Sequence, residues 1–511
     1  MGGPLPRDAT VAVIGAGAMG SGIAQVAAQA GHPVQLFDAR IGAAEEARQT
    51  ICATLDSLAA KGKISIDGAR RASSRIAAAN VLADCAGAQL VIEAIVEDPE
   101  AKRSLLRELE VIVAPETILA SNTSSLSITA LAAGLEYPQR VVGMHFFNPA
   151  PVLPLVEVVS GLATNRAVAE TIYASAKAWG KFPVHALSTP GFIVNRCARP
   201  FYGEALRLLN ERAADAATLD AVMREGAGFR MGPFELMDLI GLDVNFAVTR
   251  SVWDACFHDP RYTPSVLQRE LVAAGFLGRK SGRGFFSYGA GAAKPQPSTL
   301  PPQSRPAAVR VCGDLGLAAA LVDRWKRNGV TVNRDRACDA FPDGAISLDG
   351  GPLALTDGRT ATVRASETGE RDLVVFDLAL DYSTCARLAV ARADGCSERA
   401  WHAAVGALQA AGIAVSALDD VAGLAAMRTV AMLANEAADA VTQGIATAHD
   451  VDLAMQKGVS YPLGPLAWAD RIGAARVRDV VMNLRAHYGE DRYRVSPLIT
   501  RRCASGRPLA E

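Results

Sequence analysis

The sequence predicts an α/β domain followed by an all-helical domain, and then a degenerate second copy of both. Three observations support this fold class. Short apolar strands alternate with helical patterns up to about residue 188, whereas strands become scarce from 190 to 285. A segment rich in Pro, Gly and Ser then interrupts the pattern. Motifs of the helical part return beyond it, 232 positions later in the chain.

The first part of the chain reads as strands separated by helices. Its first apolar run ends at a glycine, and an alanine-rich segment to Ala30 separates it from the second strand, as in a βαβ unit. This alternation predicts a parallel, doubly wound sheet. The expected strands are 10–14, 34–38, 90–96, 118–120 and 141–144, and the expected helices include 99–114 and 127–134.

Apolar residues recur at helical spacing in 196–212 and 218–227, which predicts a separate helical domain. Residues 288–306 are read as a linker, because Pro, Gly and Ser cannot support a packed core. The predicted boundaries are 1–188 for the first α/β domain, 189–288 for the helical domain, 289–308 for the linker, 309–420 for the degenerate α/β domain and 421–511 for the second helical domain.

The repeat is clearest in the helical domains, where Gly232–Asp238 returns as Gly464–Asp470. Between the two helical copies, 309–316 resembles a strand with its loop and 373–377 resembles a later strand. This middle region lacks the glycine-rich, His-Phe-Phe-Asn-Pro and Ser-Asn-Thr-Ser-Ser motifs of the first part, so we expect it to be structural. The same offset also pairs Glu204 with Glu436, Asp220 with Asp452 and Arg196 with Arg428.

Composition excludes several classes of protein. The 52 basic and 53 acidic residues nearly balance, so no global charge attracts nucleic acid or an anionic membrane. The nine cysteines are scattered, odd in number and never spaced Cys-x-x-Cys, which favours free thiols in a reducing cytosol over disulfides or a metal site. The N-terminus carries no apolar leader and no run is long enough to span a membrane. We therefore expect a cytoplasmic protein.

The glycine motif Gly15–Gly20 lies between the first strand and its helix. There Gly15 permits a tight turn, Gly17 lets the backbone approach a pyrophosphate, and Gly20 lets helix and strand pack closely. Asp38, at the end of the second strand, can accept hydrogen bonds from a ribose 2′-hydroxyl, which favours NAD over NADP. Arg40 could tolerate a 2′-phosphate, and a glycine-rich turn in an ordinary α/β fold is the simpler alternative.

His145 follows the strand 141–144, at the edge where ligands of open parallel sheets bind. Alone it could be a core histidine. However, Glu157 follows after an Asn-Pro turn and a Pro-x-x-Pro run, so the chain can fold back and pair carboxylate with imidazole. Such a partner fixes the tautomer and stabilises the imidazolium, as a general base requires. The alternative for Glu157 is a surface position on an alternating strand.

Polar residues follow the strand that ends near 120, and Ser124 and Asn122 lie among them. Ser124 or Ser125 could simply cap the helix expected at 127. Asn195 lies in the segment Pro-Gly-Phe-Ile-Val-Asn-Arg, where it could likewise be an ordinary helix-terminal amide. The spacing of these residues alone leaves both readings open.

Taken in order, these segments resemble the 3-hydroxyacyl-CoA dehydrogenase family, over about 10–288 and again over 421–511. The resemblance implies a Rossmann-type first domain, NAD as cofactor and an acyl-CoA substrate. It implies that His145 is the general base, Glu157 its partner, and that Ser124 and Asn195 contact the substrate. It further implies coenzyme A phosphate contacts from Thr54 and Lys61, and NAD contacts from Met19, Asp38, Glu97, Lys102, Ser124 and Asn148.

Within this family the chain is most similar to the 3-hydroxyadipyl-CoA dehydrogenase branch, of phenylacetate breakdown. The resemblance rests on the two-copy length, on the lack of a fused hydratase segment, and on the segments 146–151 and 158–164. Short-chain 3-hydroxybutyryl-CoA enzymes are close alternatives. In the second copy Met427 stands where Asn195 stands in the first, and no equivalent of His145 or Glu157 is recognised, so one active site is expected.

Two further classes of protein stay open. One is a non-catalytic NAD-binding protein that kept the fold. The other is a β-hydroxyacid dehydrogenase acting on free acids, in which a lysine is the expected base. The second repeat is expected to pack on the first, which leaves further homo-oligomerisation open.

Overall fold

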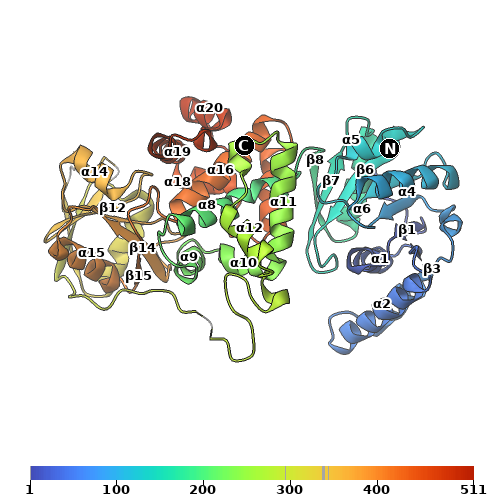
Figure 1. The fold of residues 1–511 in the computed structure, drawn as a ribbon, viewed down its shortest axis with the longest axis horizontal. Coiled ribbons are helices and arrows are strands. Elements are labelled where there is room, and N and C mark those ends of the chain that lie inside the picture. The colour runs from blue at the N-terminus through green and yellow to red at the C-terminus, as the bar shows by residue number, and fades with distance from the viewer. Residues whose placement is uncertain (1, 294, 336–339, 343) are drawn as a thin grey trace. The chain divides into compact units, whose positions relative to one another are not determined.

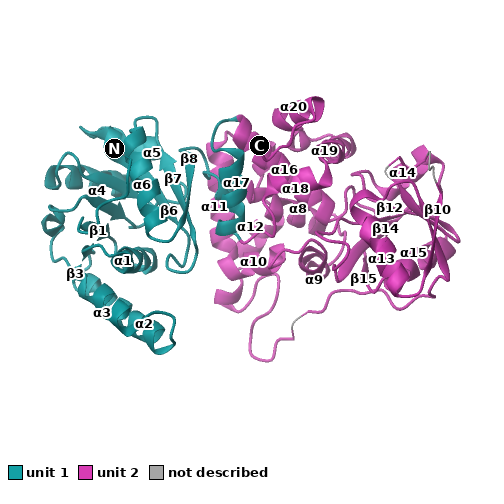
Figure 2. Ribbon diagram, turned by 180° about the vertical axis from the view of Figure 1, so that it is seen from behind, with its two compact units in different colours: residues 1–196, 443–459 teal, residues 197–442, 460–511 magenta. Residues whose placement is uncertain are grey.

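The computed structural model describes residues 2–293, 295–335, 340–342 and 344–511. Cys338 and one linker residue, Lys294, fall outside the described residues. The chain divides into two compact units: residues 1–196 with 443–459, and residues 197–442 with 460–511 (Figure 2). Each unit is described by itself below.

The first unit is built on an eight-stranded sheet within its described residues, in the order β3-β2-β1-β4-β5-β6-β7-β8 (Figure 1). The order reverses between β1 and β4, as it does in doubly wound nucleotide-binding folds. The strands are β1 (Val11–Ile14), β2 (Val34–Phe37), β3 (Ile76–Ala78), β4 (Leu90–Glu93), β5 (Ile118–Ser121), β6 (Val141–Phe146), β7 (Leu155–Ser160) and β8 (Phe182–Leu187). The helices are α1 (Ala18–Ala30), α2 (Ala43–Ala60), α3 (Ile66–Ser74), α4 (Pro99–Ile112), α5 (Ile128–Ala132), α6 (Arg166–Ala178), α7 (Val194–Cys197) and α17 (Ala448–Gly458), with short turns at η1 (Leu82–Cys85) and η2 (Pro138–Arg140).

The predicted doubly wound sheet is confirmed, but it is mixed rather than wholly parallel. Strand β7 runs antiparallel to β6, and β8 runs parallel to β7. The segment 147–154 between β6 and β7 is too short to carry a crossover helix, so the chain must return antiparallel. This reversal places His145 directly opposite Glu157 in the strand register.

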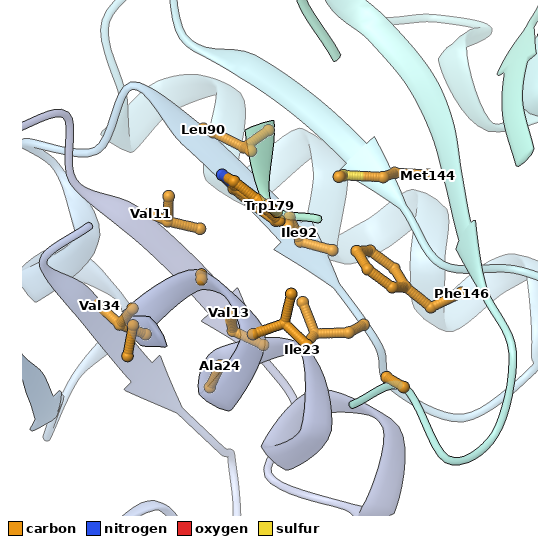
Figure 3. Close-up of a cluster of buried hydrophobic side chains, with 14 of the residues drawn as sticks. Val11, Val13, Ile23, Ala24, Val34, Leu90, Ile92, Met144, Phe146 and Trp179 are labelled. Carbon is orange, nitrogen blue, oxygen red and sulfur yellow. The ribbon is translucent and has the colours of Figure 1, made fainter. Parts of the chain in front are cut away.

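A buried apolar cluster holds α1 and α6 against the sheet. Val11 and Val13 of β1 are fully buried, as are Ile23 of α1 and Leu90 of β4. Figure 3 shows Phe146 and Trp179 in the same cluster. Alternate residues of the strands enter this one cluster, so α1 and α6 cover the same face of the sheet and hold its strands in place.

A segment of the second helical copy belongs to this first unit. Helix α17 packs on β7 and β8, and the Leu187 amide donates to the Ile445 carbonyl at 2.8 Å. Arg196 donates to the Gln443 side chain at 2.8 Å. A Cβ on Gly458 would lie 2.6 Å from Leu155 and 3.2 Å from Val194, so only glycine fits the close approach to that turn.

The second unit joins both helical copies around α16, which is buried along most of its length and contacts α8, α18, α19 and α20. Buried ion pairs join the copies: Arg428 lies 2.8 Å from Glu204, and Arg261 lies 3.0 Å from Glu436. The helices are α8 (Arg199–Asn210), α9 (Ala216–Ala221), the π-helical η3 (Val222–Gly226), α10 (Pro233–Ile240), α11 (Leu242–Ala255), η4 (Pro260–Tyr262), α12 (Val266–Ala273), η5 (Arg279–Ser281), η6 (Gly316–Ala319), α13 (Ala320–Arg327), α14 (Ala361–Thr368), α15 (Glu398–Ala410), α16 (Ala426–Thr442), α18 (Pro465–Ile472), α19 (Ala474–Tyr488), η7 (Asp491–Tyr493) and α20 (Pro497–Ser505).

A smaller mixed sheet in this unit is the degenerate copy, in the order β10-β9-β11-β12-β13-β14-β15. Strand β13 is antiparallel to β14, which is parallel to β15, as in β6, β7 and β8. Helix α9 with η3 packs beside β14, just as its repeat counterpart α17 packs on β7. The strands are β9 (Ala308–Cys312), β10 (Thr331–Asp335), β11 (Ala345–Leu348), β12 (Gly351–Leu355), β13 (Val374–Phe376), β14 (Arg387–Arg392) and β15 (Ala414–Ala417).

Three further properties hold for the described part of the chain. Its eight cysteines are free. Its residues contain no cluster of His, Cys, Asp and Glu that could hold a metal ion. Among these residues, no helix combines the length and apolar character needed to cross a bilayer.

Candidate active site

The glycine loop has the geometry that a dinucleotide requires. Gly15 has φ +105°, and a Cβ there would lie 2.6 Å from the Ala94 carbonyl oxygen. A Cβ on Gly20 would lie 1.8 Å from the Gly15 carbonyl oxygen. A Cβ on Gly17 would meet no atom of the described chain within 4 Å, although this residue caps α1. Gly15 and Gly20 are therefore needed by the protein itself, whereas Gly17 leaves room in front of the helix.

The start of α1 can receive an anion. In the described structure no side chain caps this helix, so the N–H groups and helix dipole of its first turn are available to a phosphate. Beside it, Asp38 accepts hydrogen bonds from the Ala16 amide at 2.7 Å and the Arg40 amide at 2.9 Å. The Arg40 side chain is paired with Glu46. These residues fit the pyrophosphate and ribose of NAD.

We expect Gly17→Ala to weaken NAD binding without disturbing the fold. The added methyl meets no protein atom, but it occupies the space through which the backbone approaches the pyrophosphate. The dissociation constant of NADH should rise about 10-fold or more, a loss of ~1.4 kcal/mol. Fluorescence titration measures it. Gly87→Ala is the matched control, because a Cβ there also meets nothing within 4 Å. Unchanged NADH affinity in Gly17→Ala would contradict the placement.

A buried ion pair stands at the end of β4, next to the loop after β5. The Lys102 amine lies 2.8 Å and 3.0 Å from the two carboxylate oxygens of Glu93, and both side chains are almost fully buried. The Ser121 hydroxyl also donates to Glu93. Lys102 reaches Glu97 at 3.4 Å as well. Lys102 thus has its charge neutralised inside the protein, and its contact with NAD stays a prediction. Sequence reasoning missed Glu93.

Glu97 holds the Ser-Asn-Thr-Ser-Ser loop. It accepts hydrogen bonds from the Thr123 hydroxyl at 2.7 Å and the Ser124 amide at 2.8 Å, with longer bonds from the Ser124 and Ser125 hydroxyls. Burial raises the pKa of Glu97, but the Thr123 hydrogen bond and the Lys102 charge outweigh it and hold the pKa below its usual value. Glu97 is therefore an ionised anchor for the backbone of Ser124.

The simple capping role suggested for Ser124 and Ser125 is wrong. Helix α5 begins at Ile128, and Ser127 is its cap, accepting from the Ala130 amide at 3.2 Å. Asn122 instead accepts from the Phe146 amide at 2.8 Å, which ties the loop to the end of β6. The hydroxyl of Ser124 therefore lies in a loop that is fastened beside His145 and is not used for helix capping.

His145 and Glu157 form the pair that their spacing suggested. His145 Nδ1 lies 2.7 Å from the Glu157 carboxylate, and both side chains are buried. A carboxylate can only accept, so Nδ1 carries the proton and Nε2 is left as the basic nitrogen. The imidazole packs against the rings of Phe147 and Phe192, with centroids 4.4 Å and 5.9 Å away. The alternative of an exposed glutamate on an alternating strand is excluded.

Glu157 also fixes the turn that carries Asn195. Its second oxygen accepts from the Ile193 and Val194 amides, both at 3.0 Å, where α7 begins. Asn195 then donates to the Ser124 carbonyl at 3.2 Å. One carboxylate therefore orients the imidazole and the Asn195 turn together, and the four residues proposed for catalysis belong to one connected network.

The remaining predicted contacts lie at the surface of the first unit. Asn148 is exposed in the loop after β6, and Met19 is half-buried in the first turn of α1. Thr54 and Lys61 are exposed on and just after α2, where the Thr54 hydroxyl donates to the Thr50 carbonyl at 2.8 Å. Met19 also packs against the buried apolar cluster. The contacts of these four side chains with NAD and coenzyme A remain predictions.

Comparison with known protein families agrees with this site. Residues 10–189 match the NAD-binding domain of 3-hydroxyacyl-CoA dehydrogenase, and residues 191–288 and 423–509 both match the C-terminal domain of that enzyme. The chain belongs to the 3-hydroxyacyl-CoA dehydrogenase family. Residues 353–421 match a reduced Rossmann-fold domain described for 3-hydroxybutyryl-CoA dehydrogenase. The degenerate second copy is thus part of this dehydrogenase architecture.

Individual relatives of this dehydrogenase cover one or both copies. The chain is 43% identical to 3-hydroxyadipyl-CoA dehydrogenase of Escherichia coli K12, over 96% of this chain and 97% of that protein. A probable 3-hydroxybutyryl-CoA dehydrogenase of Bacillus subtilis is 44% identical, over 54% of this chain and 96% of its own length. The crystal structure of a 3-hydroxybutyryl-CoA dehydrogenase from E. coli K12 matches with a TM-score of 0.89 and 41% identity, covering 98% of this chain and 99% of that one.

The second copy of the dehydrogenase has other residues at the positions of His145 and Glu157. The repeat offset aligns His145 with Asp377 and Glu157 with Ala389, and the strand registers agree, since Glu157 faces Val184 and Ala389 faces Ser416. Asp377 is fully buried and accepts from the Ala425, Ala426 and Met427 amides at 2.7–3.0 Å. Burial raises the pKa of Asp377 to about 6. Asp377 therefore binds the helix start that Glu157 binds in the first copy, with no imidazole beside it.

Proposed function

We propose that this chain oxidises the 3-hydroxyl group of a 3-hydroxyacyl-CoA to a ketone, with NAD as the hydride acceptor and 3-hydroxyadipyl-CoA as the substrate. The observation that carries the proposal is the buried His145–Glu157 pair. It stands at the carboxyl end of β6, on the same sheet edge as the glycine loop after β1 and Asp38 after β2. This arrangement favours a catalytic dehydrogenase over an NAD-binding protein without activity.

In the proposed reaction the alcohol oxygen is held beside Nε2 of His145. Bound NAD supplies the acceptor for the hydride that leaves C3. His145 Nε2 takes the hydroxyl proton, and the imidazolium that results is stabilised by the Glu157 carboxylate 2.7 Å away. Ser124 hydrogen-bonds the reacting oxygen and Asn195 places the acyl carbonyl. The products are the 3-oxoacyl thioester, NADH and a proton that His145 returns to solvent.

Cofactor and substrate each have residues assigned in this proposal. Gly15, Gly17, Met19, Gly20 and Asp38 bind NAD from the β1 and β2 side. Across the switch point, Glu97, Lys102, Ser124 and Asn148 complete the cofactor site. Thr54 and Lys61, exposed on and just after α2, bind the coenzyme A phosphates. The lysine base expected of a β-hydroxyacid dehydrogenase has no counterpart at the end of β6, where the base is His145.

The repeat has a proposed role in holding the site. In the first unit α17 packs beside the Asn195 turn, and in the second unit η3, which continues α9, packs beside the degenerate sheet. One helical segment of each helical copy thus packs on the sheet of the other copy. We propose that the second copy takes the place that a second subunit has in single-copy relatives, while further homo-oligomerisation remains open.

A short-chain substrate is the second candidate, because several relatives are named 3-hydroxybutyryl-CoA dehydrogenases. A steady-state panel distinguishes the two. We expect NADH formation from 3-hydroxyadipyl-CoA with a kcat/KM at least about 10-fold above that of 3-hydroxybutyryl-CoA, equivalent to ~1.4 kcal/mol. The free hydroxy acids should be poor substrates. A preference for the C4 ester would favour the short-chain alternative, and no NADH from any ester would refute the proposed function.

A further inference from the structure

Glu93 is a buried carboxylate at the carboxyl end of β4, which lies in the middle of the sheet of the first unit. Strand β4 stands between β1, which leads into the glycine loop, and β5, which leads into the Ser-Asn-Thr-Ser-Ser loop. The side chain of Glu93 is fully buried, so the protein shields it from substrate and cofactor. Any effect of Glu93 on the reaction must therefore pass through the residues that it holds.

One connection runs from Glu93 to the loop through the neighbouring strand β5. Glu93 and Ser121 are paired in the parallel register, and the Ser121 hydroxyl donates to the Glu93 carboxylate. The oxygen of that hydroxyl accepts from the Thr123 amide at 3.2 Å. The Asn122 amide donates to the Glu93 carbonyl at 2.9 Å. Glu93 thus fixes the start of the loop that carries Ser124 through both its side chain and its backbone.

A second connection runs through the amine of Lys102, which lies between two carboxylates. Lys102 Nζ is 2.8 Å and 3.0 Å from the two oxygens of Glu93, and 3.4 Å from Oε2 of Glu97. The other oxygen of Glu97 accepts from the Thr123 hydroxyl at 2.7 Å and from the Ser124 amide at 2.8 Å. One cation therefore serves two anions. Its closer pairing with Glu93 leaves Glu97 available to hold the Ser124 loop.

The buried charges are not needed merely to fill space at this edge of a sheet. An apolar pair of similar volume is often as stable as a buried ion pair, because burying charge is costly. In the degenerate sheet, β11 begins beside the carboxyl end of β12 with Ala345 and Ile346, both buried and apolar. That copy also has no histidine at the position aligned with His145. The Glu93–Lys102 pair thus belongs to the copy that carries the proposed active site.

We propose that Glu93 is a positioning residue for the dehydrogenation, which takes up the charge of Lys102 and so keeps the Ser124 hydroxyl at the reacting oxygen. This inference rests on the proposed function. When Glu93 is made neutral, Lys102 is left with Glu97 as its carboxylate among the described residues, and draws Glu97 inward from the Ser124 amide. A misplacement of about 1 Å in a positioned group costs up to ~10²-fold in rate.

The test measures the single-turnover rate of NADH formation at saturating NAD, with the CoA ester that the wild type oxidises fastest. We expect Glu93→Gln, which is close in size, to lower this rate about 10- to 100-fold. In a Ser124→Ala background the same substitution should change the rate less than about 2-fold, because the hydroxyl that it displaces is already absent. Ser121→Ala removes one connection and no charge, and should lower the rate about 2- to 10-fold, the ratio for one hydrogen bond.

Glu110→Gln is the matched control. Glu110 lies on α4, as Lys102 does, and accepts from the Glu136 and Tyr137 amides at 2.9 Å and 3.0 Å. It also lies 3.4 Å from the buried guanidinium of Arg140. Arg140 directly precedes β6, so this substitution removes a largely buried charge at the opposite, amino edge of the sheet. It should lower the thermal midpoint but keep the wild-type rate.

The outcomes separate the two proposals. If the wild type forms no NADH from any ester, the proposed function and this inference both fall. If the wild type is active and folded Glu93→Gln keeps its rate, only the role of Glu93 is overturned. A rate loss that is undiminished in the Ser124→Ala background, or equalled by Glu110→Gln, overturns that role as well, because the buried charge then serves only stability. If Glu93→Gln does not fold, Ser121→Ala decides, and a wild-type rate there overturns the role.

Discussion

Replacing His145 by glutamine should lower kcat by roughly 10²–10⁴-fold, the usual loss on removing a general base. Glutamine is close in size, and its amide can still donate to Glu157, so the buried site stays filled and paired. What disappears is the basic Nε2. The measurement is the initial rate of NADH formation at saturating 3-hydroxyacyl-CoA and NAD, together with fluorescence titration of NADH, whose affinity should be unchanged.

The matched control is His185→Gln. His185 lies on β8 of the same sheet, half-exposed and stacked on Tyr173 of α6. It pairs with Val158, the neighbour of Glu157 in β7, so its side chain lies on the opposite face of the sheet from Glu157. It should keep the wild-type rate. Near-normal turnover in His145→Gln would remove this residue from the chemistry and, with it, the observation on which the proposed function depends.

The contact between His145 and Glu157 was predictable because its geometry follows from strand direction. A turn containing Asn148, Pro149 and Pro151 allowed the chain to return beside β6, and an antiparallel return places residues twelve positions apart opposite one another. The burial of Glu157 was not predictable. Strand alternation suggests a solvent face, but here that face is covered by the α7 turn and by α17, which comes from a segment almost 300 residues later.

The ion pair of Glu93 and Lys102 shows a different limit. A strand-end acid and a helix-borne lysine nine residues apart have no periodicity in common, so spacing alone did not join them. A single acid in the middle of the apolar run 90–96 was the available signal.

The 232-residue repeat offset aligns structural features of the two copies as well as their sequence motifs. It aligned Gly232–Asp238 with Gly464–Asp470, and it also aligns the strained backbone of Phe192, with φ +48°, with that of Leu424, with φ +52°. The same alignment places Asp377 at the position of His145. In both copies a buried carboxylate binds the amides at the start of the following helix, so the second copy has this structural bond but no histidine at the aligned position.

The second large effect is expected at Glu157, whose carboxylate binds the Ile193 and Val194 amides. Glu157→Gln should lower kcat by roughly 10²–10⁴-fold while leaving the Asn195 turn in place. The glutamine carbonyl can accept from the Ile193 and Val194 amides as Glu157 does now. Its NH₂ group then faces Nδ1 of His145. A donor there forces Nδ1 to be the acceptor and moves the ring proton to Nε2, the nitrogen that must be basic.

Glu157→Ala separates the two roles of the carboxylate. It leaves two buried amides without an acceptor and an imidazole without a partner, so it should lower both kcat and the free energy of unfolding, the latter by about 1–3 kcal/mol per unsatisfied group. Glu157→Gln should lower kcat alone, with a thermal midpoint near that of the wild type. If Glu157→Gln retained full turnover, the carboxylate would serve only to hold the α7 turn, and His145 would act without an anionic partner, as Asp377 holds its helix without an imidazole.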